Sequence, residues 1–191
     1  MKKLSFLLLS LLAASLALQA QEKTKEPIKP ALLVIDIQNK FLPWMDEKDK
    51  ETGMMYIKGY IEEFRKLGLP IIRIYHSDPK EGPFPGTPEF EFPDDTGITK
   101  DDPMIVKTYG NSFTKTDLDK ILKEKGVNTL FLCGLSSVGC VLATYIGAQD
   151  HDYKAFFLKD AIFSHNAEYT SQIETIFNAL DWEVVNLLIQ Q

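Results

Sequence analysis

The sequence has few cysteines, no excess of basic charge and, beyond its first 20 residues, no long hydrophobic run. Two cysteines in 191 residues exclude a disulfide framework, so they either pair once or one of them does chemistry. The chain has 21 basic and 27 acidic residues, and no basic patch predicts a nucleic-acid partner. After the N-terminal segment, no apolar run reaches the roughly 18 residues expected of a membrane span.

The first residues have the layout of a secretory signal peptide. Two lysines precede an apolar run over residues 4–18, and Ala20 supplies a small residue before a polar stretch. This run is shorter than the roughly 20 residues of a membrane helix, although an uncleaved anchor is the competing interpretation. We expect residues 1–20 to be removed on export to the periplasm or the medium. Residues 21–30 are then a flexible leader, and residues 31–191 form one domain.

Short apolar runs alternate with helical patterns along this domain. Residues 31–35 are apolar throughout, which is typical of a strand buried on both faces of a parallel sheet. The alternation predicts an α/β fold in which helices cover both faces of a parallel sheet. The expected strands are residues 31–35, 70–75, 104–106, 129–133, 155–158 and 183–188, and the expected helices are 55–66, 115–125, 141–150 and 168–180.

Residues 77–103 form a long excursion between the second and third expected strands. The segment holds six of the ten prolines and three glycines, so regular structure throughout is not expected. Long loops inside compact domains usually have a function. We expect this one to cover a binding site.

An acid, an amine and a thiol are expected at one edge of the sheet. Asp36 follows the first strand, Lys107 follows the third, and Cys140 follows the turn after the fourth. Sites in open parallel sheets form beyond the carboxyl ends of the strands. A helix N-terminus and a nearby ammonium favour the thiolate of Cys140, and a carboxylate would accept and return its proton. Taken singly, Asp36 also fits a turn cap, Lys107 a solvated surface lysine, and Cys140 a small buried residue.

The other cysteine, Cys133, ends an apolar run and is expected to be buried and inert. A Cys133–Cys140 disulfide is the competing account for an exported protein. The tight turn over residues 134–139 would demand unusual geometry for that bond.

Three motifs resemble those of the isochorismatase-like cysteine hydrolases. Residues 31–42 (ALLVIDIQNKFL) resemble the opening strand of that family, and residues 107–113 (KTYGNSF) resemble its lysine motif. Residues 132–144 (LCGLSSVGCVLAT) are similar to its nucleophile turn and helix. The motifs occur in family order, and the likeness runs from about residue 31 to residue 188. The resemblance implies a Rossmann-like, three-layer fold with a six-stranded parallel sheet.

The resemblance also implies a catalytic triad of Asp36, Lys107 and Cys140. A cis peptide bond between Leu135 and Ser136 is implied as well, with the N–H groups of Ser136 and Cys140 as an oxyanion hole. The implied reaction cleaves a C–N bond of a small amide or N-carbamoyl compound through a thioester, without a cofactor and in a homo-oligomer. The alternatives are hydrolysis of an isochorismate-like vinyl ether, small-molecule binding without catalysis, and redox sensing by Cys140.

Two stretches depart from the family pattern. Family members commonly carry Thr-Asp shortly before the cysteine, where this chain has Val138-Gly139. The nicotinamidase subgroup carries an Asp-x-His metal motif after the second strand, where this chain has a lone His76, so no metal site is expected. Candidate substrate contacts near the strand ends are Gln38, Phe41, Trp44, His76, Tyr109, Phe113 and His165.

Overall fold

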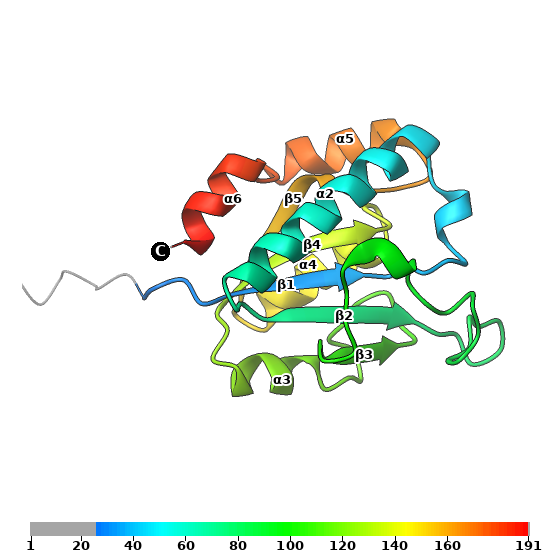
Figure 1. Ribbon diagram of the computed structural model, residues 1–191, viewed down its shortest axis with the longest axis horizontal. Helices are drawn as coiled ribbons and strands as arrows, with labels where there is room; N and C mark the ends of the chain where they lie inside the picture. The colour runs from blue at the N-terminus through cyan, green and yellow to red at the C-terminus, as the bar shows by residue number, and fades with distance from the viewer. Residues whose placement is uncertain (1–25, 191) are drawn as a thin grey trace, which may run out of the picture.

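A computed structural model describes residues 26–190, so the expected signal peptide lies outside the described residues. The strands are β1 (Pro30–Ile35), β2 (Ile71–His76), β3 (Met104–Lys107), β4 (Thr129–Leu135) and β5 (Lys154–Phe163). They form one sheet in the order β3-β2-β1-β4-β5, in which every pair of neighbours is parallel (Figure 1). The α/β fold with a parallel sheet is therefore as predicted.

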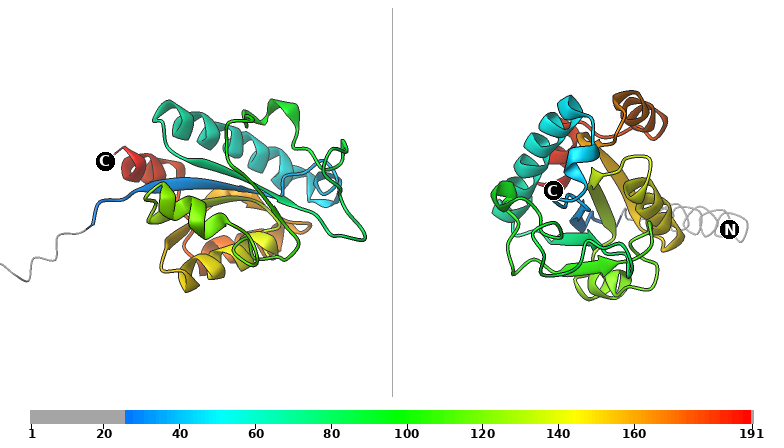
Figure 2. Two further views of the ribbon diagram at one scale, coloured as in Figure 1. Left: turned by 90° about the horizontal axis from the view of Figure 1, so that it is seen from below. Right: turned by 90° about the vertical axis from the view of Figure 1, so that its right-hand side faces the viewer.

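The helices cover both faces of this sheet (Figure 2). Alternate residues of β1 point to opposite sides, so Leu33 packs in one core cluster and Leu32 in the other. The first cluster contains residues of α3 (Leu118–Glu124), α4 (Cys140–Asp150) and α5 (Ala167–Ile176). The second contains residues of α2 (Glu47–Lys66) and α6 (Trp182–Ile189), and two short 3₁₀ helices complete the fold, η1 (Leu42–Trp44) and η2 (Asp94–Thr96).

The sixth strand expected at residues 183–188 is wrong, because this segment is the helix α6. Val185 and Ile189, one helical turn apart, are buried, whereas Leu187 is 70% exposed. Trp182 packs on Tyr60 of α2 with the ring centroids 4.6 Å apart. Periodicity alone does not separate a short buried strand from a buried helical segment. The sheet therefore has five strands.

Two boundaries differ from the expected ones because of local hydrogen bonds. Asp46 caps α2 by accepting a hydrogen bond from the Asp49 N–H (3.1 Å), so this helix begins well before residue 55. Asn128 donates to the Pro27 carbonyl and accepts from the Lys29 N–H (both 2.9 Å). The end of the expected leader is therefore attached to the domain.

Gly134 lets β4 approach β1 closely at the point where both strands finish. Its φ of +112° lies in a region that side chains rarely adopt, and a side chain here would collide with the Ile35 backbone. Ile35 and Gly134 are directly paired in the sheet. The turn after β4 therefore lies beside the residue that follows β1.

The excursion over residues 77–103 packs beside the chain that leaves β1. The N–H groups of Asn39 and Lys40 donate to the carbonyls of residues 91 and 89 (2.9 and 3.0 Å). Phe90 and Phe92 of this excursion stack on Tyr75, with ring centroids 4.8 and 4.1 Å from the tyrosine ring. The middle of the excursion therefore forms a wall beside residues 39–40.

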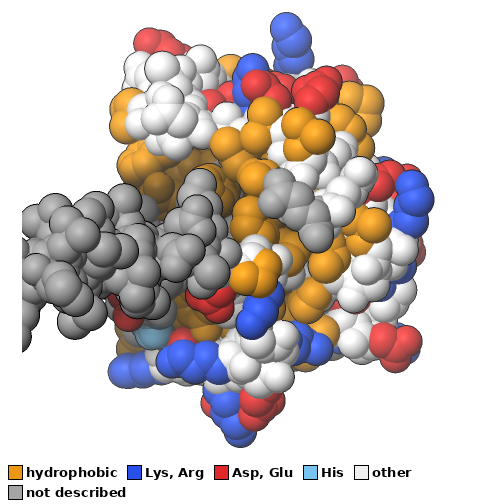
Figure 3. Space-filling view, turned by 90° about the vertical axis from the view of Figure 1, so that its left-hand side faces the viewer, with side chains coloured by type: hydrophobic (Ala, Val, Ile, Leu, Met, Phe, Trp, Pro, Cys, Tyr) orange, Lys and Arg blue, Asp and Glu red, His pale blue; other side chains and the backbone are white. Residues whose placement is uncertain are grey.

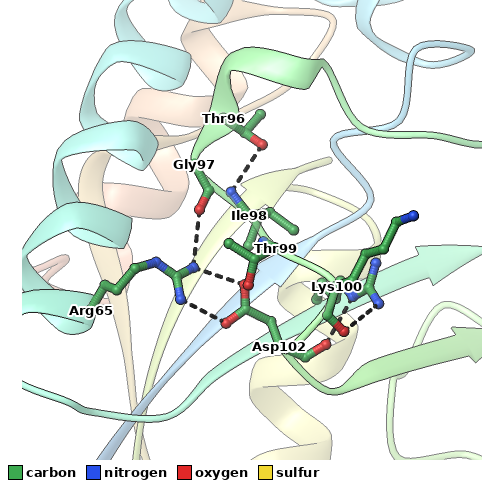
Figure 4. A network of polar contacts seen from close by, with 8 residues as sticks. Arg65, Thr96, Gly97, Ile98, Thr99, Lys100 and Asp102 are labelled. Atoms are coloured by element: carbon green, nitrogen blue, oxygen red, sulfur yellow. Dashed lines mark hydrogen bonds and ion pairs between the residues drawn. The ribbon is translucent and has the colours of Figure 1, made fainter.

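Asp102 fastens the last part of this excursion to α2 (Figure 4). The Arg65 guanidinium donates to both carboxylate oxygens (3.1 and 2.8 Å), and the Thr99 N–H donates to one of them (2.7 Å). Burial raises the pKa of Asp102, but the hydrogen bonds from Arg65 and Thr99 outweigh it and leave that pKa below its ordinary value.

We expect Asp102→Asn to lower the free energy of unfolding by about 1–3 kcal/mol at neutral pH, because it removes charged hydrogen bonds. A carboxyl whose pKa is lowered by folding stabilises the protein above its unfolded pKa of about 4, and this contribution is lost as the pH falls through the folded pKa. The difference between wild type and variant should therefore shrink in acid. Urea unfolding of the wild type and the variant from neutral to acidic pH measures this difference in the free energy of unfolding. The exposed Asp101→Asn is the control. A difference independent of pH would contradict the prediction.

Hydrophobic side chains lie on the surface at the end of the sheet where the strands begin (Figure 3). The helix α6 lies at this end and leaves Val184 and Leu187 exposed. No helix within residues 26–190 has both the length and the apolar character of a membrane span.

Candidate active site

Asp36 and Lys107 form a buried ion pair at the end of the sheet where the strands finish. Asp36 directly follows β1, and Lys107 is the last residue of β3. The Lys107 Nζ lies 2.7 Å from the Asp36 Oδ2, and the two side chains are 0% and 3% exposed. The strand between them in the sheet is β2, so the long lysine side chain reaches across one strand.

Cys140 is the first residue of α4, and its half-buried side chain faces this pair. The Sγ lies within 4.8 Å of an Asp36 carboxylate oxygen. Burial and the Asp36 charge raise the pKa of the Cys140 thiol to about 12, although Lys107 lowers it. The helix terminus and the ammonium favour the thiolate, as expected from the sequence, but burial and the carboxylate charge outweigh them. The resting side chain is therefore a thiol beside a carboxylate that can accept its proton.

Several polar atoms of the residues at the ends of β1, β2 and β4 have no hydrogen-bond partner among the described residues. Within residues 26–190, five buried side-chain atoms lack a partner, and three of them are Asp36 Oδ1, His76 Nδ1 and Ser136 Oγ. Among the turn and cap hydrogen bonds of residues 26–190, the backbone N–H groups of Ser136 and Cys140 have no backbone acceptor. Buried polar groups in folded proteins are nearly always paired, so a cluster of open ones indicates a ligand site.

The turn before Cys140 is fixed by backbone hydrogen bonds. The peptide bond between Leu135 and Ser136 is cis. The Ser137 N–H donates to the Phe163 carbonyl (2.9 Å), and the Ser136 carbonyl accepts two N–H groups at the start of α4 (2.8 and 3.2 Å). The Ser136 amide and the sulfur thus belong to one ordered turn between β4 and α4.

His76 ends β2 beside the ion pair, and Gln38 holds it there. The fully buried Gln38 carboxamide accepts from the His76 N–H (2.7 Å) and donates to the His76 carbonyl (3.0 Å). Phe41 packs edge-on against the imidazole at a centroid distance of 6.0 Å. Burial and the Lys107 charge lower the pKa of His76, so the ring is neutral at pH 7. Gln38 therefore positions His76, and its contact with substrate stays a prediction.

Three other candidates are exposed near the ends of the strands. Trp44 is 62% exposed and packs edge-on against Phe41 at 5.8 Å. Tyr109 accepts a hydrogen bond from Lys115 (2.9 Å) through its hydroxyl. His165 packs edge-on against Tyr169.

Two further side chains lie in the core, away from the site. The Phe113 ring is buried and stacks on His151 with centroids 4.6 Å apart, and its contact with substrate stays a prediction. Cys133 is fully buried and its thiol donates to the Leu33 carbonyl (3.4 Å). Both cysteines are free, so the alternative of a Cys133–Cys140 disulfide is excluded.

Comparison with family models matches residues 30–180 to the Isochorismatase domain. The chain belongs to the isochorismatase family. The isochorismatase family protein YddQ of Bacillus subtilis (strain 168) is 34% identical over 151 residues, which are 75% of this chain and 81% of that protein. The sequence resemblance to the isochorismatase-like hydrolases is thus confirmed.

Two solved amidase structures have the same fold as this isochorismatase-family chain. Pyrazinamidase of Pyrococcus horikoshii, in complex with zinc, has a TM-score of 0.68 at 28% identity and covers 78% of this chain and 94% of its own. N-carbamoylsarcosine amidase from Thermoplasma acidophilum has a TM-score of 0.70 at 25% identity and covers 81% and 95%. The family thus includes amidohydrolases, which supports a hydrolase that acts on C–N bonds.

Proposed function

We propose that this protein is an exported cysteine hydrolase that cleaves a C–N bond of a small amide or N-carbamoyl compound. The observation that carries the proposal is a thiol within 4.8 Å of a carboxylate that a buried lysine holds in place. Unpartnered polar atoms of Asp36 and His76, two residues close to that thiol, are available to a small polar substrate. The amidases among the structural neighbours support the same reaction class.

Asp36 is the general base in the proposed reaction. Its Oδ2 is bound by Lys107, whereas its Oδ1 has no partner among the described residues and is free to accept the thiol proton. With a thiol pKa of about 12, little thiolate exists at neutral pH. Proton transfer to Asp36 therefore accompanies the attack of the Cys140 sulfur on the carbonyl carbon.

The amides of Ser136 and Cys140 form the proposed oxyanion hole. When the S–C bond forms, negative charge develops on the substrate oxygen, and two N–H groups without other acceptors would stabilise it. The C–N bond then breaks as Asp36 returns the proton to the leaving nitrogen, which departs as ammonia or an amine. Asp36 next takes a proton from water, the hydroxide attacks the thioester, and Cys140 leaves as a thiol.

An ammonia-release screen tests the proposal. We expect at least one compound among small primary amides, ureido acids and nicotinamide to release ammonia with the wild type and not with Cys140→Ala. If no compound in these three classes is hydrolysed above the Cys140→Ala blank, the proposal is wrong. Export is tested separately by sequencing the N-terminus of the mature protein, which we expect to begin near residue 21.

A further inference from the structure

Three metal-ligating atoms meet at the site although the sequence contains no metal motif. One ligand atom each of Asp36, His76 and Cys140 lies within 4.8 Å of the other two. Asp36 follows β1, His76 ends β2, and Cys140 begins the helix after β4. The strands β2, β1 and β4 are neighbours in the sheet. Only the sheet order brings them together. A metal motif in the sequence would need a second histidine near His76. The structure instead brings Asp36 and Cys140 to His76 as the other two donors.

Two of these side chains present an atom that nothing else in the described residues binds. Lys107 occupies the Oδ2 of Asp36, and the Oδ1 of this 2% exposed residue is left without a partner. The Nδ1 of His76 is likewise buried and unpartnered. Because Gln38 fixes the His76 backbone and Phe41 flanks the ring, the imidazole is already ordered. Such an ordered ligand needs little reorganisation to bind an ion.

We propose that Asp36, His76 and Cys140 bind a borderline-soft divalent cation such as Zn²⁺, and that the bound ion inhibits the hydrolase by occupying its sulfur. A thiolate, an imidazole and a carboxylate suit Zn²⁺, whereas Mg²⁺ and Ca²⁺ prefer oxygen ligands. Zinc–donor distances of about 2.0–2.3 Å require the three atoms to close by roughly 1 Å, which side-chain rotation supplies. The inhibitory effect rests on the proposed function, since it requires Cys140 to be the nucleophile.

Binding exchanges the thiol proton for the metal ion. The S–H bond breaks, the proton passes to solvent, and the electron pair left on the sulfur forms the S–Zn bond, with no change of oxidation state. Metal binding should therefore strengthen as the pH rises. The Lys107 ammonium, 2.7 Å from the Asp36 carboxylate, opposes the charge of the ion. We accordingly expect the metal ion to bind reversibly, so that a chelator removes it.

Titration of the metal-free full-length protein with Co²⁺, followed by competition with Zn²⁺, tests this site. We expect one equivalent of Co²⁺ to give thiolate-to-cobalt charge-transfer absorption, which Zn²⁺ then abolishes. Cys140→Ala should abolish the absorption, and His76→Ala should weaken Co²⁺ affinity at least about 10-fold. The matched controls, His165→Ala for the imidazole and Cys133→Ala for the thiol, should leave the affinity unchanged.

A measurement on the wild type keeps the test independent of variant folding. Zn²⁺ should protect Cys140 from iodoacetamide, and ammonia release should fall over the same Zn²⁺ range and recover with chelator. Absence of both the charge-transfer absorption and the protection would overturn the cation site. A chelated protein that is inactive until Zn²⁺ is added would overturn the inhibitory role. Cobalt binding with the expected variant pattern, but no ammonia release from any amide, would support the site and contradict the proposed function.

Discussion

Cys140→Ala is expected to lower kcat/KM for the amide substrate by about 10⁴-fold or more, because the substitution removes the atom that forms the acyl-enzyme. The substitution removes a single sulfur atom from a half-buried position, so the far-ultraviolet circular dichroism and the unfolding midpoint should stay close to those of the wild type. Steady-state ammonia release measures the loss. Alkylation of the wild type with iodoacetamide should produce the same inactivation.

Cys133→Ala is the matched control for this experiment. Its thiol is fully buried and hydrogen-bonded to the Leu33 carbonyl, so the variant should lose about 1 kcal/mol of stability and keep its activity. Retention of activity in Cys140→Ala would reject the thioester mechanism.

Lys107→Met is expected to lower the free energy of unfolding by about 3–5 kcal/mol and to abolish activity. The substitution leaves the Asp36 carboxylate buried without the cation that lies 2.7 Å from it, and an unpaired buried charge is costly. Urea unfolding at pH 7 measures the loss. Lys123→Met is the matched surface control, because Lys123 is 67% exposed in its pair with Asp119 and such pairs contribute under about 1 kcal/mol.

The double variant Asp36→Asn/Lys107→Met separates stability from catalysis. Removal of both charges should restore most of the stability lost in Lys107→Met, because no unpaired ion remains in the interior. Activity should stay absent, since asparagine cannot take the thiol proton. A double variant no more stable than Lys107→Met would show that the ion pair is not the source of the loss.

The strands near the centre of the sheet were predictable because their physical requirement is local. A strand covered by helices on both faces is expected to be a nearly continuous apolar run, and residues 31–35 and 130–133 meet that condition. Residues 183–188 (EVVNLL) are mostly apolar and are nevertheless helical, because Val185 and Ile189 pack in the same core cluster as α2. Whether such a segment is a strand or a helix depends on partners that are distant in the sequence.

The sequence by itself determined which side chains meet: in a parallel sheet, residues such as Asp36, Lys107 and Cys140 that follow the strands lie at one edge. Only the tertiary structure decided their chemical state and their neighbours. Burial and the Asp36 charge keep Cys140 protonated, Gln38 binds the backbone of β2, and His76 becomes a third donor beside the thiol. Desolvation and Coulomb interactions depend on distances through space, so they exist only once separate segments have packed together.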